Sequence, residues 1–283
     1  MIDNNTSIHS APSLIGRAGG ESAKIERYGF AVEPFHVDFT GHLFLGVLGN
    51  HLLNAAGRHS HNRGWGIDHL NQTHLTWVLS RLSIELTEMP AQYEHVEVET
   101  WVESVMKLFT ERNFLIRNAD DGRIYGYARS IWAMIDVETR QPSNLLELKD
   151  GDILNYVIPA DEKPCPIAKY RPARPASEPA VRTIDTYYSD VDINGHINSI
   201  KYIEHILDLF PREQFAGHRL RRFDIAYKAE SYLGDTLTFI CQAADDLTPR
   251  NPSTAYDIVI RKNVGAKGKP EGESIIQAKV SWM

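Results

Sequence analysis

The sequence predicts an α+β protein built from two similar halves, each a curled antiparallel sheet around one long helix. Two observations support this prediction. The segment VDFTGHLFLGVLGNHLL from Val37 aligns without a gap with VDINGHINSIKYIEHIL from Val191. Further along, the segments that begin at Arg81 and Arg222 also align, in the same order. Two ordered matches indicate a duplicated domain, and one apolar helix followed by several strands is best buried by a sheet that curls around it.

Length and composition agree with a folded protein of two domains. A chain of 283 residues can bury two cores, and 42% hydrophobic with 24% charged residues is ordinary for a soluble protein. No apolar run approaches 18 residues, so we expect no membrane span. Residues 1–24 lack the apolar core of a secretory signal and are expected to form a flexible N-terminal arm.

Cysteine usage and charge narrow the classes of function. Cys165 and Cys241 suggest neither a disulfide scaffold nor a zinc site, so we expect no metal and no cofactor, and a cytoplasmic setting. The net charge is −7, and the second half is less acidic than the first. Nucleic-acid binding requires a strongly basic face, so we do not expect it.

The first domain is expected over residues 25–150. A strand over 28–38 leads into a helix over 41–61, whose Gly46 and Gly49 would let another segment approach closely. Residues 62–74 have loop composition and hold the 13 extra residues of the first copy. Four runs rich in β-branched and aromatic residues follow as strands, with a hairpin turn at 118–122.

Residues 151–180 are expected to form a linker between the domains. Six prolines fall within this stretch, and proline favours stiff, extended backbone. The second domain, residues 181–283, repeats the order of strand, helix and antiparallel strands.

Three polar residues stand at alternate positions before the second helix. Asp192, Asn194 and His196 precede an apolar stripe with helical spacing. At a helix N-terminus, free backbone N–H groups and the positive end of the dipole favour developing negative charge. Asp192 alone would more often be a turn or capping residue than a catalytic one, and His196 alone fits a structural role at the helix end as well as a chemical one.

Three segments carry a resemblance to a known family. They are LTWVLSRLSIELTEMPAQYEHVEVETWV, RSIWAMIDVETRQPSNL and SDVDINGHINSIKYIEHIL, in that order. With them the chain resembles the acyl-ACP thioesterases, which have two tandem hot-dog domains and hydrolyse fatty acyl-acyl-carrier-protein, from about Tyr28 to the C-terminus. The plant members begin with a plastid extension that this sequence lacks, so it looks like a bacterial-type member.

The resemblance implies four catalytic residues, namely Asp192, Asn194, His196 and Glu230. Three family positions differ: Gly195 replaces a glutamine, Ser199 replaces the second of two consecutive asparagines, and Ser231 replaces the cysteine that commonly follows the glutamate. We therefore do not expect an acyl-enzyme on cysteine.

The chemistry of thioester hydrolysis fits these residues. The reaction needs an activated water and donors for the carbonyl oxygen as it becomes an oxyanion. Glu230 can act as general base or attack directly to form an anhydride, and Asn194 and His196 can donate hydrogen bonds. Asp192 is expected to hold one of them in orientation.

The first copy is expected to lack catalysis and to hold the acyl chain. Thr40 replaces Asn194 and Met89 replaces Glu230 at the matching positions. The apolar side chains of the first helix are predicted to line the acyl pocket, with plain core packing as the alternative. They are Leu45, Val47, Leu48 and Leu52.

The implied partner is acyl carrier protein bearing a phosphopantetheine-linked acyl chain. This partner is acidic, and we predict that it docks on Arg212, Arg219 and Arg221 just beyond the second helix. We expect a monomer or a homodimer. The alternatives are another hot-dog enzyme, namely an acyl-CoA thioesterase or a dehydratase, and a non-catalytic acyl sensor.

Overall fold

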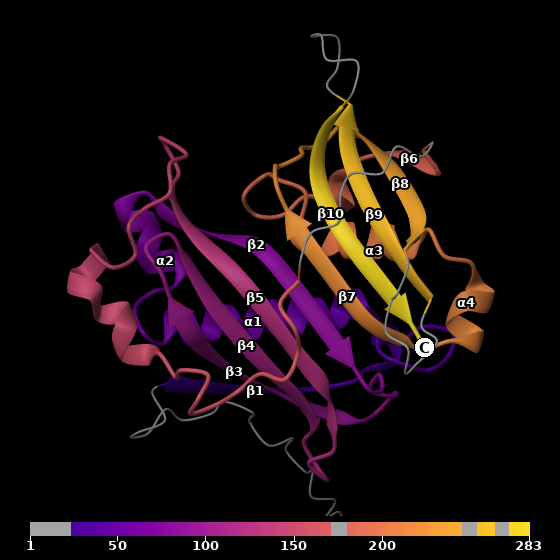
Figure 1. Ribbon diagram of the computed structural model, residues 1–283, viewed down its shortest axis with the longest axis horizontal. Helices are drawn as coiled ribbons and strands as arrows, with labels where there is room; N and C mark the ends of the chain where they lie inside the picture. The colour runs from indigo at the N-terminus through magenta and orange to yellow at the C-terminus, as the bar shows by residue number, and fades with distance from the viewer. Residues whose placement is uncertain (1–23, 171–179, 245–253, 264–271) are drawn as a thin grey trace, which may run out of the picture.

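The two halves share one continuous sheet. The computed structural model describes residues 24–170, 180–244, 254–263 and 272–283, so the predicted N-terminal arm lies almost wholly outside the described residues. Ten antiparallel strands follow the order β1-β3-β4-β5-β2-β7-β10-β9-β8-β6 (Figure 1). The prediction of two curled antiparallel sheets is confirmed, and the structure adds that their edges are joined.

The first half contains the longer helix. Its elements are β1 (Ile25–Ala31), η2 (Pro34–His36), α1 (Leu45–His61), α2 (Ile67–Leu70), η3 (Asn71–Thr73), β2 (Leu75–Leu86), β3 (His95–Val105), β4 (Phe109–Asn118), β5 (Ile124–Asp136) and η4 (Leu148–Tyr156). The hairpin predicted at 118–122 joins β4 to β5, with the Asn118 side chain accepting the N–H groups of Asp120 and Asp121. The predicted loop over 62–74 contains α2 and η3 and buries Trp65.

The second half repeats this plan with a shorter helix. Its elements are β6 (Arg182–Asp185), η5 (Tyr188–Asp190), α3 (Ser199–Leu207), α4 (Arg212–Gly217), β7 (Leu220–Tyr227), β8 (Thr236–Ala244), β9 (Thr254–Asn263) and β10 (Glu273–Trp282). No helix among the described residues is long and apolar enough to cross a membrane.

The pairing of β2 with β7 joins the halves about a pseudo-two-fold axis. Ser83 pairs with Asp224, which is also its counterpart in the repeat, so the axis passes between these two residues. Arg222 bonds Glu85 on β2 at 2.9 Å and Asp224 on its own strand at 2.8 Å. The two strands that define the repeat in the sequence are therefore the two that meet in space.

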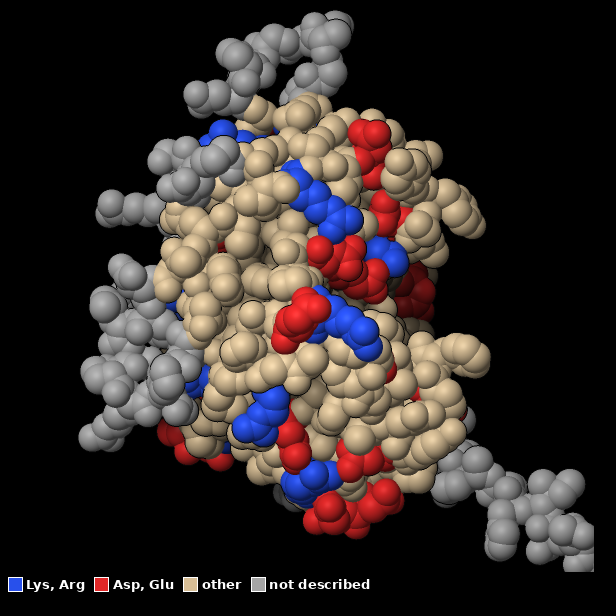
Figure 2. All heavy atoms as spheres, turned by 90° about the vertical axis from the view of Figure 1, so that its right-hand side faces the viewer, with Lys and Arg blue, Asp and Glu red and all other residues tan. Residues whose placement is uncertain are grey.

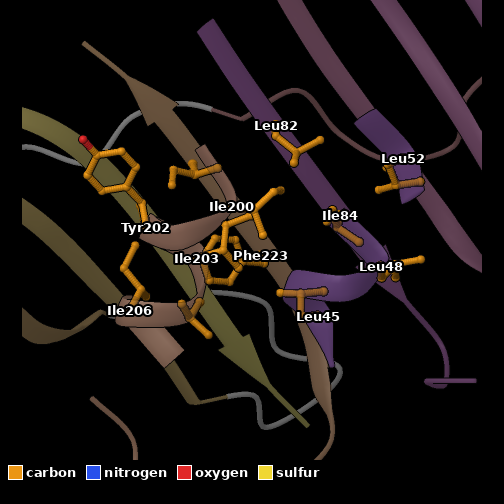
Figure 3. Close-up of a cluster of buried hydrophobic side chains, with 14 of the residues drawn as sticks. Leu45, Leu48, Leu52, Leu82, Ile84, Ile200, Tyr202, Ile203, Ile206 and Phe223 are labelled. Atoms are coloured by element: carbon orange, nitrogen blue, oxygen red, sulfur yellow. The ribbon is translucent and has the colours of Figure 1, made fainter. Parts of the chain in front are cut away.

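Both long helices pack on the same face of the sheet and contact each other. Leu48 and Leu52 of α1 share one core with Ile200 and Ile203 of α3 (Figure 3). The close approach predicted at the helix glycines is confirmed. A Cβ at Gly49 would lie 2.7 Å from Ile200 Cδ1, and one at Gly46 would lie 2.7 Å from Glu204 Oε1.

The interdomain segment covers the outer face of the first sheet rather than acting as a free spacer. Val157 pairs in parallel with Val102 of β3, and Ile158 and Ile167 are buried. Lys163 and Lys169 form ion pairs of 2.7 Å with carboxylates on β3 and β4. Residues 171–179 lie outside the described residues. Apolar side chains scattered between the prolines anchor the described part of the segment.

Beneath this segment lies a buried ion pair. Arg129 on β5 donates to Glu103 on β3 at 2.8 Å, and Asn113 donates to the same carboxylate at 2.6 Å. Burial opposes ionisation of Glu103, but these hydrogen bonds outweigh it and hold the pKa of Glu103 below its ordinary value of 4.5. The pair stabilises the fold only while the carboxylate is charged.

We predict that Glu103→Gln lowers the free energy of unfolding by about 3–5 kcal/mol at neutral pH, because it leaves Arg129 buried without its counter-charge. In the wild type, the contribution of Glu103 is complete above its unfolded pKa of about 4.5 and is lost as the pH falls through the lower folded value. Urea denaturation as a function of pH would measure both effects.

The matched control is Glu88→Gln. Glu88 pairs with Arg123 at 3.0 Å, and both side chains are largely solvated. Removal of this surface pair should cost less than about 1 kcal/mol. Equal losses in the two variants would contradict a special contribution of the buried pair.

Candidate active site

A tight turn precedes the second helix and carries the three predicted polar residues. We call residues 191–197 the Asp192 turn. Val191 pairs with Ile197 across it, and Gly195 has φ +78°, a left-handed conformation that suits glycine. In the first copy Val37 pairs with Leu43, and Gly41 also has φ +78°. The repeat therefore preserves the turn itself.

The carboxylate of Asp192 holds this turn through the backbone. Its Oδ1 accepts the N–H groups of Asn194 at 2.8 Å and of His196 at 3.3 Å. Asp192 thus fixes the backbone of Asn194 and of His196, whereas the sequence had predicted only that it holds one of them in orientation.

The turn lies just before the helix N-terminus. The helix α3 begins at Ser199, and the side chain of Asn198 caps it by accepting the N–H of Ile200 at 2.9 Å. The three polar residues were expected to lie at the mouth of the helix, but they precede its first turn. Their geometry is set by the turn and not by the helix cap.

Glu230 meets this turn from the segment after β7. His196 pairs with Tyr232 in an antiparallel bridge, which brings Glu230 Oε1 within 3.5 Å of His196 Nδ1. The Tyr232 hydroxyl donates to the other carboxylate oxygen of Glu230 at 3.3 Å. All four predicted catalytic residues line one cavity of about 370 Å³.

The opposite wall of this cavity comes from the first half. It includes the start of β2 around Trp77, together with Asn71 and Arg140. The Arg140 guanidinium donates to Glu230 across the boundary between the halves. Sequence reasoning missed Arg140 as a site residue, although it lies in the second segment on which the family resemblance rests.

Ser231 and the two cysteines are not placed to act as nucleophiles at this cavity. Ser231 is fully buried, and its hydroxyl is engaged by Tyr202. Burial, helped by the charge of Asp257, raises the pKa of Cys241 to about 11. Burial likewise raises the pKa of the Cys165 thiol. Neither cysteine lines the cavity.

The four α1 side chains predicted to line the acyl pocket line neither of the two cavities. Leu45, Leu48 and Leu52 are almost fully buried in the core, and Val47 packs against it. A second cavity of about 230 Å³ is lined by the following turns of the same helix, from Leu53 to Ser60. Side chains of α1 that fill the core and those that line the second cavity are both apolar and both recur at helical spacing. The sequence alone therefore could not distinguish the two groups.

The arginines predicted for docking are not brought to the cavity. Arg219 and Arg221 flank the first residue of β7, whereas Glu230 follows its last residue. Arg212 lies over the ring of Phe39 at 4.7 Å. A strand of eight residues separates the two groups by about 26 Å.

One group of side chains could hold a metal by composition. The ligand atoms of His61, Asp68 and His69 all lie within 4.8 Å of one another. All three residues are exposed, and none of them lines either cavity. This group is separate from the site at Glu230.

Comparison with solved structures finds the same fold in acyl-ACP thioesterases. The crystal structure of an acyl-ACP thioesterase from Bacteroides thetaiotaomicron is 49% identical, with a TM-score of 0.81, and the match covers 94% of this chain and 100% of that one. The 12:0-ACP thioesterase from Umbellularia californica shares the fold at 20% identity, with a TM-score of 0.75 over 95% of this chain and 99% of that one.

Sequence comparison gives the same family. The chloroplastic oleoyl-acyl carrier protein thioesterase 2 of Arabidopsis thaliana is 25% identical over 251 residues, which are 84% of this chain and 66% of the relative. The chain thus spans about two thirds of that relative's length. Residues 24–149 match the acyl-ACP thioesterase N-terminal domain and residues 174–283 the C-terminal domain. The chain therefore belongs to the acyl-ACP thioesterase family.

Proposed function

We propose that this protein hydrolyses the thioester of an acyl chain carried by acyl carrier protein, releasing the free acid. The observation that carries the proposal is the convergence of Glu230, His196 and Asn194 on one cavity that both halves enclose. Family membership supports the same reaction. The reaction needs one base and at least one oxyanion donor, and this cavity offers both.

Glu230 is the candidate base. Its carboxylate lies between the Arg140 guanidinium, the His196 ring and the Tyr232 hydroxyl. These three contacts fix the position of the carboxylate. A water held against this carboxylate can lose its proton to Glu230 as it attacks the thioester carbon.

Asn194 and His196 are the candidate donors to the carbonyl oxygen. Among the residues that the structure describes, none forms a hydrogen bond with the side-chain amide of Asn194, and this side chain is exposed at the cavity. The backbone N–H groups of both residues donate to the Asp192 carboxylate, so the backbone that carries the two side chains is held in place before the substrate binds. Such preorganised donors stabilise the oxyanion of the tetrahedral intermediate.

The central test is Glu230→Gln with a ladder of acyl-carrier-protein thioesters. The change keeps the volume of the side chain but removes the base, so we expect kcat to fall by about 100-fold or more, with little change in melting temperature. Release of free acid would be followed by mass spectrometry. Near-normal turnover would remove Glu230 from the mechanism, and a wild type that acts only on acyl-CoA would favour the acyl-CoA thioesterase alternative.

A second prediction concerns Arg140 as a positioning residue. Arg140→Gln frees the Glu230 carboxylate from the first half, and misplacement of a base by about 1 Å can cost up to about 100-fold in rate. We expect a lower kcat with a nearly unchanged KM, and partial recovery in Arg140→Lys. If Arg140→Gln lowers the melting temperature but leaves kcat unchanged, Arg140 stabilises the fold and does not position Glu230.

The surface charges bear on how the carrier protein docks. On the face of the second half in Figure 2, Lys and Arg alternate with Asp and Glu instead of forming a basic patch. Lys228 is exposed two residues before Glu230, at the catalytic end of β7. We propose that the carrier docks over the cavity mouth, where Lys228 contacts its acidic surface.

We predict that Lys228→Glu raises KM for the carrier-bound substrate several-fold and weakens its salt dependence, because rim charges act mainly on the rate of encounter. A small acyl-pantetheine thioester should be unaffected. Arg221→Glu at the far end of β7 is the matched control. A larger effect of Arg221→Glu would place the docking surface on the arginines that the sequence suggested.

A further inference from the structure

A second cavity lies within the first half of the chain. Trp77 lines both the catalytic cavity and the cavity of about 230 Å³ behind it. Trp65 and Trp132 line the inner cavity, together with Leu53 and Ala56 of α1. An acyl chain whose thioester lies at Glu230 would pass Trp77 to enter this space.

Most of the side chains that line the inner cavity are apolar, but two arginines, Arg63 and Arg112, also line it. Arg112 lies on the face of β4 that also carries Phe114 and Ile116, and that face packs against α1. Its side chain lines the cavity, and the residue is only 5% exposed. It bonds Thr100 Oγ1 at 3.2 Å, His59 Nδ1 at 3.2 Å and Ser60 Oγ at 3.5 Å.

The charge of Arg112 is not balanced by a carboxylate. Within the described part of the chain, no Asp or Glu oxygen lies within 4.0 Å of its guanidinium, whereas the buried Arg129 has Glu103 and Arg63 has Glu26. Burial, and then the charge of Arg63, lower the pKa of Arg112 to about 9. Burial and both arginines also hold the pKa of His59 well below its ordinary value, so the ring accepts a hydrogen bond from Arg112 as a neutral group.

A wholly hydrocarbon tail would leave this arrangement unexplained. An unpaired buried cation is costly, and a methyl terminus placed against it offers no compensation. An oxygen on the substrate would accept a hydrogen bond from the guanidinium, and a carboxylate would also balance its charge. The three tryptophans would enclose the methylenes that lead up to this oxygen.

We propose that Arg112 is a specificity-determining residue that binds an oxygen-containing group at the distal end of the acyl chain. A terminal carboxylate is the best match, and a hydroxyl or keto group is a neutral acceptor of the same hydrogen bonds. This inference rests on the proposed thioesterase function and names the class of its substrate. The alternative is a purely structural arginine that ties the end of α1 to β4 through His59 and Ser60.

The test compares three sets of carrier-bound thioesters over a ladder of chain lengths, ending in a methyl, a terminal hydroxyl or a terminal carboxylate. For the wild type we expect kcat/KM at the best length to be about ten-fold or more higher for an oxygen-terminated chain, because a hydrogen bond to a charged group discriminates on that scale. Preference for the methyl terminus at every length would overturn the inference and leave the thioesterase function intact.

The variants assign the preference to one side chain. In Arg112→Met, the ratio of kcat/KM between oxygen-terminated and methyl-terminated chains should fall toward one, whatever the absolute rates. Arg117→Met changes an arginine on the same strand that pairs with Glu97 near the surface, and it should leave the ratio unchanged. An unchanged ratio in Arg112→Met would overturn the proposal.

Two further measurements apply if Arg112→Met does not fold or if the wild type shows no activity. If Arg112→Met does not fold, Arg112→Lys keeps the charge but not the forked donors, and the ratio should still fall.

If the wild type hydrolyses none of these thioesters, the proposed function fails. Calorimetric binding of equal-length free acids to the Glu230→Gln protein then tests the inference separately. Tighter binding of the dicarboxylic acid, lost in the Glu230→Gln/Arg112→Met double variant, would support it, and equal binding would overturn it.

Discussion

The hydrogen-bonded pairing of β2 with β7 is the constraint on which the rest of the structure depends. It makes two sheets into one and fixes the halves in a single relative position, with Ser83 opposite Asp224. The helices α1 and α3 must then meet on the same side of the sheet, which Gly46 and Gly49 allow. Because β2 begins at the cavity and β7 ends there, the same pairing brings Trp77 and Arg140 to the residues of the second half.

The duplication preserves a turn and varies its chemistry. In the first copy, Asp38 Oδ1 accepts the N–H of Thr40 at 2.7 Å, as Asp192 does for Asn194. His42 pairs with Ala91 in the same bridge that His196 makes with Tyr232. However, the Thr40 hydroxyl bonds back to Asp38 at 2.6 Å, and Met89 stands at the position of Glu230. The first copy therefore keeps the geometry of the turn without the carboxylate.

Residues whose role depends on local pattern were predictable from the sequence. The repeat, the helices and most strands follow from spacing, and the four polar residues at the catalytic cavity follow from the family resemblance. Contacts between distant segments were not predictable. Arg140 reaches Glu230 only because the halves join at β2 and β7, and apolar residues of α1 look alike whether they line a cavity or fill a core. Arg112 did leave a signal, since it occupies an inward position two residues before Phe114 on β4.

We propose that the second half supplies the chemistry while the first half holds the acyl chain. A crystal structure of the protein with an acyl-carrier protein whose thioester is replaced by a non-hydrolysable amide would test it most directly. We expect the acyl carbonyl oxygen to lie beside Asn194 and His196, and the chain to pass Trp77 into the cavity lined by Trp65 and Trp132. A chain that enters the core of the second half, beneath α3, would contradict it.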